Sequence, residues 1–171
     1  TWKKVHYISE KVGAVALAMN KDNPQEIYAG AWQAERKPWT IMSGGPADVT
    51  GVYKTTDGGE TWTHLSNGLP AGLIGKIDID VARSKPSTVY ALMEADQGQE
   101  GLYRSDDSGA TWRRVSNDRR LTGRPFYYIY VDVDPTNPET VWVNNLSLLK
   151  STDGGKAWTT IDTPHGDNHG M

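Results

Sequence analysis

The chain has 171 residues, with 18 Lys and Arg against 21 Asp and Glu, for a formal charge of -3. This near-neutral balance gives no reason to expect a nucleic acid or an anionic membrane as partner. No apolar run approaches the roughly 20 residues that span a bilayer. Cysteine is absent, which excludes disulfides, cysteine-bound zinc and cysteine nucleophiles. Seven Trp and eight Tyr beside one Phe indicate strand-rich structure with rings at repeated positions.

The N-terminal segment reads as a strand. The run Thr1-Trp-Lys-Lys-Val5 opens directly into a strand pattern and shows no signal-peptide pattern. It matches the second half of a unit that recurs later in the chain. We therefore expect residues 1–8 to be the orphan outer strand of a repeat severed just upstream, and the chain to be a piece of a longer protein.

A polar turn between two strands occurs three times, with the pattern Ser/Thr-x-Asp-x-Gly-x-x-Trp. Each Gly stands where a tight turn needs a positive φ, and each Asp can accept hydrogen bonds from the backbone amides of its own turn. Each Trp places a large ring over the turn. The three copies, here called the Asp turns, consist of Thr55, Asp57, Gly59 and Trp62; Ser105, Asp107, Gly109 and Trp112; and Ser151, Asp153, Gly155 and Trp158.

A second marker precedes each Asp turn. A proline followed by a short apolar strand begins at Pro24, Pro86 and Pro138, and an alternating strand comes before each proline. One repeat is therefore four strands, and four-stranded antiparallel repeats of about 40–50 residues indicate β-propeller blades. The sequence predicts an all-β partial propeller: blades at 12–66, 72–116 and 126–162, and a truncated connection at 163–171. Three blades cannot close a ring, so we expect self-association through exposed blade faces.

The chain resembles a known family. The turn is similar to the Asp box, or BNR repeat. The run Tyr28-Ala-Gly-Ala-Trp-Gln33, the Asp turns, the run Arg124-Pro-Phe-Tyr-Tyr128 and the run His165-Gly-Asp-Asn-His169 resemble bacterial sortilin-like BNR-repeat "glycosyl hydrolase" propellers, related to family 74 xyloglucanases. The resemblance implies a secreted or periplasmic protein, and places the Asp boxes at the blade periphery, away from the functional site.

Propeller topology separates the scaffold from the candidate site. The Asp turns and the turns at the prolines lie on one face, and the remaining connections lie on the other. The long insertion 33–50 belongs to that other face. Trp32 and Trp39 there suit stacking against sugar rings, and Arg36 supplies a planar donor fork. Alternatively, the two Trp residues pack the insertion onto its blade.

Two further groups belong to the same face. Arg124 and Tyr127 are suited to binding a carboxylate or a polyol, although they could also be ordinary loop and core residues. His165, Asp167 and His169 alternate, so an extended loop would present them on one side. They could hold a divalent metal or supply a general base. No distant ligand completes such a site, so we expect neither a metal nor a cofactor.

Glycoside hydrolysis needs two carboxylates roughly 5–9 Å apart across a cleft. Glu94 and Asp96 lie in the loops of the candidate face, but the sequence selects no pair. The Asp residues of the inner strands, such as Asp78 and Asp80, are predicted to face the channel or a neighbouring blade. The sequence thus favours part of a carbohydrate-active propeller that is itself inactive. The alternative is a sortilin-like propeller that binds peptide or protein ligands.

Overall fold

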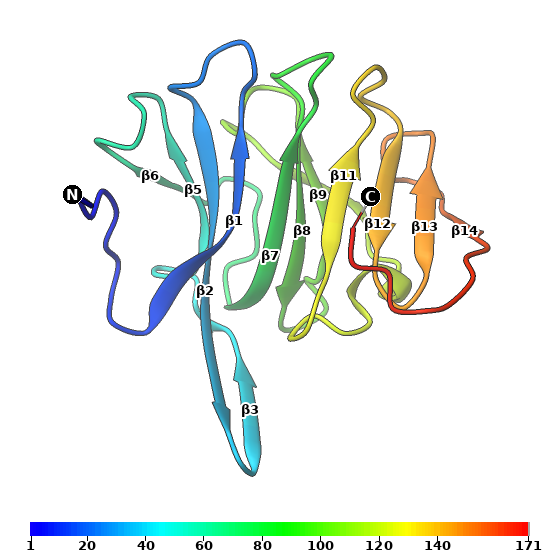
Figure 1. The fold of residues 1–171 in the computed structure, drawn as a ribbon, viewed down its shortest axis with the longest axis horizontal. Coiled ribbons are helices and arrows are strands. Elements are labelled where there is room, and N and C mark those ends of the chain that lie inside the picture. The colour runs from blue at the N-terminus through cyan, green and yellow to red at the C-terminus, as the bar shows by residue number, and fades with distance from the viewer. Residues whose placement is uncertain (171) are drawn as a thin grey trace.

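The computed structural model describes residues 1–170, which form three antiparallel sheets standing side by side in chain order (Figure 1). Met171, the last residue of the predicted connection 163–171, lies outside the described residues. A short 3-10 helix, η1 (Arg119–Thr122), lies between the second and third sheets in the chain. Within residues 1–170, no helix is long and apolar enough to cross a membrane.

Each sheet places four strands in chain order, so that hairpins join neighbouring strands. The first sheet consists of β1 (Val12–Met19), β2 (Ile27–Lys37), β5 (Gly51–Thr55) and β6 (Thr63–Leu65). The second consists of β7 (Leu73–Val81), β8 (Val89–Ala95), β9 (Gly101–Ser105) and β10 (Arg113–Ser116). The third consists of β11 (Tyr130–Val133), β12 (Val141–Asn144), β13 (Leu148–Ser151) and β14 (Thr159–Ile161). This arrangement is the predicted all-β partial propeller, and each sheet is one blade.

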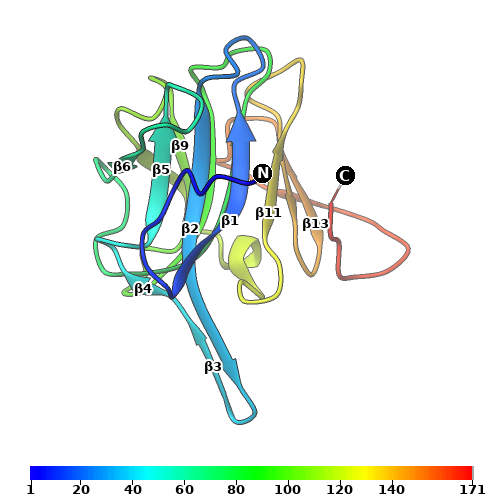
Figure 2. The ribbon, with the colours of Figure 1, turned by 60° about the vertical axis from the view of Figure 1, so that its left-hand side comes forward.

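The insertion in the first blade forms a hairpin rather than the predicted loop. β2 continues beyond its blade and pairs with β3 (Thr40–Ser43), so the hairpin projects from the body of the molecule (Figures 1 and 2). Pro38 and Trp39 are the two residues at its tip, and a two-residue connection is the commonest link between antiparallel strands. The insertion then crosses to the second blade, where β4 (Gly45–Pro46) pairs with the start of β7.

Residues 1–8, predicted as an outer strand, form no strand. A strand requires a neighbouring backbone with which to exchange hydrogen bonds, and this segment pairs with none of the described strands. Its side chains nevertheless take the position expected of an outer strand. Val5 lies against Gly59 of the first Asp turn, as Leu65 lies against Gly109 of the second.

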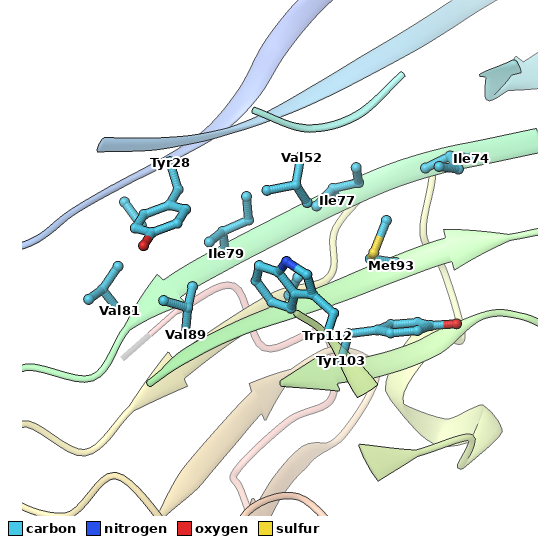
Figure 3. Packing of buried hydrophobic residues seen from close by; sticks show 12 residues of the cluster. Tyr28, Val52, Ile74, Ile77, Ile79, Val81, Val89, Met93, Tyr103 and Trp112 are labelled. Carbon is cyan, nitrogen blue, oxygen red and sulfur yellow. The ribbon is translucent and has the colours of Figure 1, made fainter. Parts of the chain in front are cut away.

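Most of the core lies between the blades, where facing sheets pack side chains into two apolar clusters, and a third, smaller cluster packs Ile8 of the N-terminal segment against the first blade. In the first cluster, Tyr28 and Val52 of the first blade meet Ile77, Ile79 and Tyr103 of the second (Figure 3). The second cluster fills the equivalent space between the second and third blades. Because the inner strands β1, β7 and β11 contact one another in turn, the blades are held in a fixed order.

The outward-facing side of the first blade differs from the blade faces inside the molecule. Leu17, Ile79 and Val131 occupy the same place in the three repeats, on the face that points toward the preceding blade. Ile79 is 5% exposed and Val131 is 3% exposed, because each packs against the blade before it. Leu17 is 68% exposed. Along its inner strand the first blade therefore exposes an apolar surface that the other two blades bury, whereas Ala29, Ala31 and Tyr53 of its next strands are buried in a cluster that includes Ile8 of the N-terminal segment.

Candidate functional site

The Asp turns satisfy their own polar groups. In the second turn the Ser105 hydroxyl donates to Asp107 over 2.7 Å and accepts the Gly109 amide over 2.8 Å. The Asp107 carboxylate also accepts the Thr111 hydroxyl over 2.6 Å and the Thr111 amide over 2.9 Å, and these bonds, with that from Ser105, lower its pKa to about 2. Trp112 donates from its ring nitrogen to the Gly109 carbonyl. The other two turns repeat this pattern, so the edge that carries them is a self-contained scaffold.

The opposite edge carries the projecting hairpin, and its two tryptophans have different environments. Trp32 is half-buried, with its ring edge-on to Phe126 at 5.5 Å between centroids. Its ring nitrogen donates to the Ser43 hydroxyl over 3.1 Å. Trp39 is 94% exposed at the hairpin tip. Trp32 therefore packs within the protein, as one of the two interpretations predicted. Trp39 is not buried by any of the described residues.

A hollow of about 490 Å³ lies beside the base of the hairpin. The first blade contributes Ser43, the second contributes Glu94, and the segment leading into the third contributes Arg124, Phe126 and Tyr127. These residues come from connections that are distant in the sequence. Of the candidates predicted from the sequence, three line this hollow: Glu94, Arg124 and Tyr127.

One oxygen of the Glu94 carboxylate, Oε2, already accepts two hydrogen bonds. It accepts hydrogen bonds from the Ser43 hydroxyl and, over 2.9 Å, from the backbone amide of Lys76. Asp96 does not line the hollow, because its carboxylate accepts the Leu73 amide over 3.1 Å and holds a turn. The hollow is thus lined, among the described residues, by one carboxylate rather than the pair that hydrolysis needs.

Tyr127 carries the exposed aromatic surface of the site and is 50% exposed. The Arg36 guanidinium lies 6.0 Å from the centre of its ring, and the Arg124 guanidinium lies 5.7 Å from it. Both distances allow cation–π attraction. The structure therefore brings together Arg36 from the hairpin with Arg124 and Tyr127 from the third-blade connection.

Asp167 joins this cluster, but the two neighbouring histidines do not converge with it. Asp167 lies 3.5 Å from the Arg124 guanidinium and accepts a hydrogen bond from the Tyr128 hydroxyl. His169 packs against the Tyr128 ring at 4.2 Å between centroids, and the exposed His165 ring has its Nδ1 2.6 Å from the Gly166 carbonyl oxygen. Within residues 1–170, no three His, Asp or Glu side chains are grouped to hold a metal ion.

Sequence reasoning missed Lys76, Ser43 and Phe126. Lys76 is 6% exposed, and its ammonium donates to the Tyr127 carbonyl over 2.9 Å while lying 5.7 Å from the centre of the Trp32 ring. Burial lowers the pKa of Lys76, opposed by the nearby Asp78 and Glu94 carboxylates. The one signal available was a lysine within an inner strand of alternating isoleucine and aspartate.

The inner-strand aspartates face the neighbouring blade. Asp78 accepts the Val131 amide over 2.7 Å, and Asp80 accepts the Val133 amide over the same distance. Burial raises the pKa of Asp78 to about 7 and that of Asp80 to about 6. These carboxylates connect β7 to β11, so their place is structural.

Comparison with solved structures identifies the fold. A GH74 enzyme from Niastella koreensis is similar at a TM-score of 0.61 and 23% identity, over 90% of this chain and 23% of that one. An ancestral GH74 enzyme gives a TM-score of 0.60 at 16% identity, over 91% of this chain and 21% of that one. YCF48 from Cyanidioschyzon merolae gives 0.59 at 16% identity, over 93% of this chain and 42% of that one.

These similarities establish the β-propeller fold. A structure of YCF48 bound to D1 peptide is also similar, with a TM-score of 0.60 and 14% identity, over 92% of this chain and 44% of that one. The chain spans less than half the length of each of these proteins. No family model matches the sequence, and no curated protein matches it.

Proposed function

We propose that this chain is the ligand-binding part of a carbohydrate-active propeller, and that it binds a polysaccharide without cleaving it. The observation that carries the proposal is the half-exposed Tyr127 ring beside an open hollow, with Phe126 and Trp32 packed behind it. Flat aromatic faces bind the apolar faces of sugar rings, and polar groups at the rim fix their orientation. We infer that Trp39, which is exposed at the hairpin tip, supplies a second aromatic contact.

Binding without turnover follows from the carboxylates. Glu94 is the carboxylate that lines the hollow among the described residues, and both Ser43 and Lys76 hold it by hydrogen bonds. A glycosidase needs an acid and a base or nucleophile on opposite sides of the scissile bond. We infer that hydrolysis would require a second carboxylate from outside this chain.

The proposal is tested by measuring the binding of neutral xyloglucan by affinity electrophoresis and calorimetry. We expect Tyr127→Ala to weaken binding at least tenfold and Trp39→Ala to weaken it less, with no product released by any of these proteins. Tyr7→Ala is the matched control, because Tyr7 is 56% exposed on the N-terminal segment. Binding that is unchanged by Tyr127→Ala would place the ligand elsewhere.

A peptide ligand is the second candidate. The arginines beside Tyr127 favour it, since guanidinium groups pair with peptide carboxylates, and one structural neighbour is a propeller bound to a peptide. Screening a glycan array alongside a peptide library separates the two candidates. Enrichment of peptides whose binding depends on Arg36 and Arg124, with no glycan retained, would favour the receptor function.

We also propose that a second copy of the chain covers the exposed face of the first blade. Leu17 and Met19 are 68% and 54% exposed there. In the second blade, Tyr90 and Arg104 contact the third blade. The equivalent positions of the third blade are Trp142 and Lys150, and the Lys150 ammonium lies 4.5 Å from the centre of the Trp142 ring. Two copies joined in this way supply six blades, within the usual range for a closed propeller.

Light scattering over a range of concentrations tests this association. We expect a mass above that of the monomer, reduced to the monomer by Leu17→Arg but not by Leu73→Arg, since Leu73 is a comparably exposed residue (53%) at the start of β7. A monomer at all concentrations would contradict it.

A further inference from the structure

Two arginines from different blades meet at one tyrosine ring. Arg36 lies on the hairpin of the first blade, and Arg124 lies on the connection that leads into the third. Their guanidinium groups lie 6.0 Å and 5.7 Å from the centre of the Tyr127 ring. Because the two arginines are 88 positions apart in the sequence (124 minus 36), their convergence depends on the packing of the blades.

The hydrogen-bonding capacity of these arginines is largely unused. Among residues 1–170, Arg36 has no ion pair and no side-chain hydrogen bond within normal distances. Arg124 has one ion pair, at 3.5 Å to Asp167, in which both side chains are about half exposed. By contrast, Arg104 makes short contacts to two carboxylates. A guanidinium carries five N–H donors, so most donors of Arg36 and Arg124 face solvent.

A third cation contacts the backbone of Tyr127. The buried Lys76 ammonium donates to the Tyr127 carbonyl, and this is its one hydrogen bond in the described structure. The carboxylates nearby are Asp78 and Glu94 beside Lys76 and Asp167 beside Arg124, and each already accepts hydrogen bonds from neighbouring groups. Asp78 and Glu94 balance the charge of Lys76, whereas on the exposed side of Tyr127 two guanidinium groups, Arg36 and Arg124, face the single carboxylate of Asp167, so the charge on that side favours an anion.

We propose that this cluster binds the carboxylate of a uronic acid in an acidic polysaccharide. A uronate carries an apolar ring face and a carboxylate in one sugar unit. The Tyr127 ring can contact the face while Arg36 or Arg124, beside the same ring, pairs with the carboxylate by two parallel N–H···O bonds. The inference rests on the proposed function and names its ligand class.

The test compares polygalacturonate with neutral xyloglucan, using calorimetry on the full chain. Polygalacturonate should bind at least tenfold more tightly, and its affinity should fall as salt is raised. Arg36→Gln and Arg124→Gln should each weaken polygalacturonate binding about tenfold and weaken xyloglucan binding by a clearly smaller factor, because a neutral chain offers no carboxylate to pair with the guanidinium. Arg83→Gln is the matched control, because Arg83 is exposed and lies in the turn between β7 and β8. Circular dichroism verifies that each variant is folded.

The possible outcomes distinguish uronate recognition from polysaccharide binding in general. Equal affinity for both polymers, with no effect of either arginine variant, would overturn the uronate inference and leave polysaccharide binding intact. Failure of both polymers to bind would overturn both. Binding of poly-glutamate through Arg36 and Arg124, with polygalacturonate rejected, would overturn the glycan assignment in favour of an acidic peptide.

Discussion

The two edges of the blades use polar groups in opposite ways. At the Asp-turn edge, each carboxylate and hydroxyl of the repeated motif is bonded within its own turn, and the three turns are nearly identical. At the other edge, Arg36 and Arg124 converge on Tyr127 with much of their hydrogen-bonding capacity unused. A satisfied edge contributes stability, whereas an edge with free donors and an exposed ring is available to a ligand.

The largest expected effect concerns the bridge between blades near the Asp-turn edge. The Arg104 side chain is 8% exposed and contacts Glu139 of the third blade over 2.6 Å and Asp106 over 2.7 Å. Arg104→Met should lower the free energy of unfolding by about 3 kcal/mol, because Glu139 loses its ion-pair partner and Asp106 keeps only the exposed Arg113. Urea denaturation measures this loss.

Arg113→Met is the matched control for that substitution. Arg113 also pairs with Asp106, but its side chain is 57% exposed, so its loss should cost less than about 1 kcal/mol. Ligand binding at the opposite edge should be unaffected in both folded variants. Equal losses of stability would show that the bridge between blades is no stronger than a surface ion pair.

The two tryptophans of the hairpin provide the next test. Trp32→Ala should cost about 2 kcal/mol of stability, since the ring packs against Phe126 and bonds to Ser43. Trp39→Ala should change stability by less than about 0.5 kcal/mol, because its side chain is exposed at the tip. Thermal and urea unfolding of the two variants check the difference. A large loss from Trp39→Ala would mean that the hairpin tip packs against another surface in solution.

The last test is a dependence of stability on pH. The pKa of Asp78 is raised to about 7 and that of Asp80 to about 6, from a model-compound value of 3.8. The folded state therefore holds these protons more tightly than the unfolded state. Their contribution to stability is present at low pH and is lost as pH rises from about 4 to about 7. His6, whose pKa burial lowers, acts in the opposite direction.

Comparison with an Asp78→Asn, Asp80→Asn double variant isolates that contribution, because His6 is common to both proteins. Asn can still accept the amides of Val131 and Val133 through its side-chain oxygen. Between about pH 5 and pH 7.5, the Tm of the unchanged protein should fall relative to that of the double variant. Parallel Tm curves would mean that the two aspartates do not titrate in this range.

Local patterns made the scaffold predictable. The Asp turns recur with fixed spacing, and a tight turn with a glycine at positive φ depends only on neighbouring residues; Gly59, Gly109 and Gly155 have φ of 98°, 86° and 89°. The alternating strands are likewise local, and each blade places its four strands in the order in which they occur in the sequence. The hairpin at residues 33–43 carries no glycine turn signal at its tip, which is Pro38 and Trp39. Its nearest glycines come after the second strand, so the sequence pattern does not reveal it.

The sequence by itself therefore determined the repeat and the all-β class, because these follow from spacing and side-chain alternation, and it predicted the edge at which a site belongs. Tertiary structure alone decided which residues meet. It turned Asp78 and Asp80 toward the next blade, left Trp39 exposed and placed Arg36 beside Tyr127. The contacts of Asp78, Asp80 and Arg36 join residues from different blades. A local sequence pattern does not specify how two blades pack against each other.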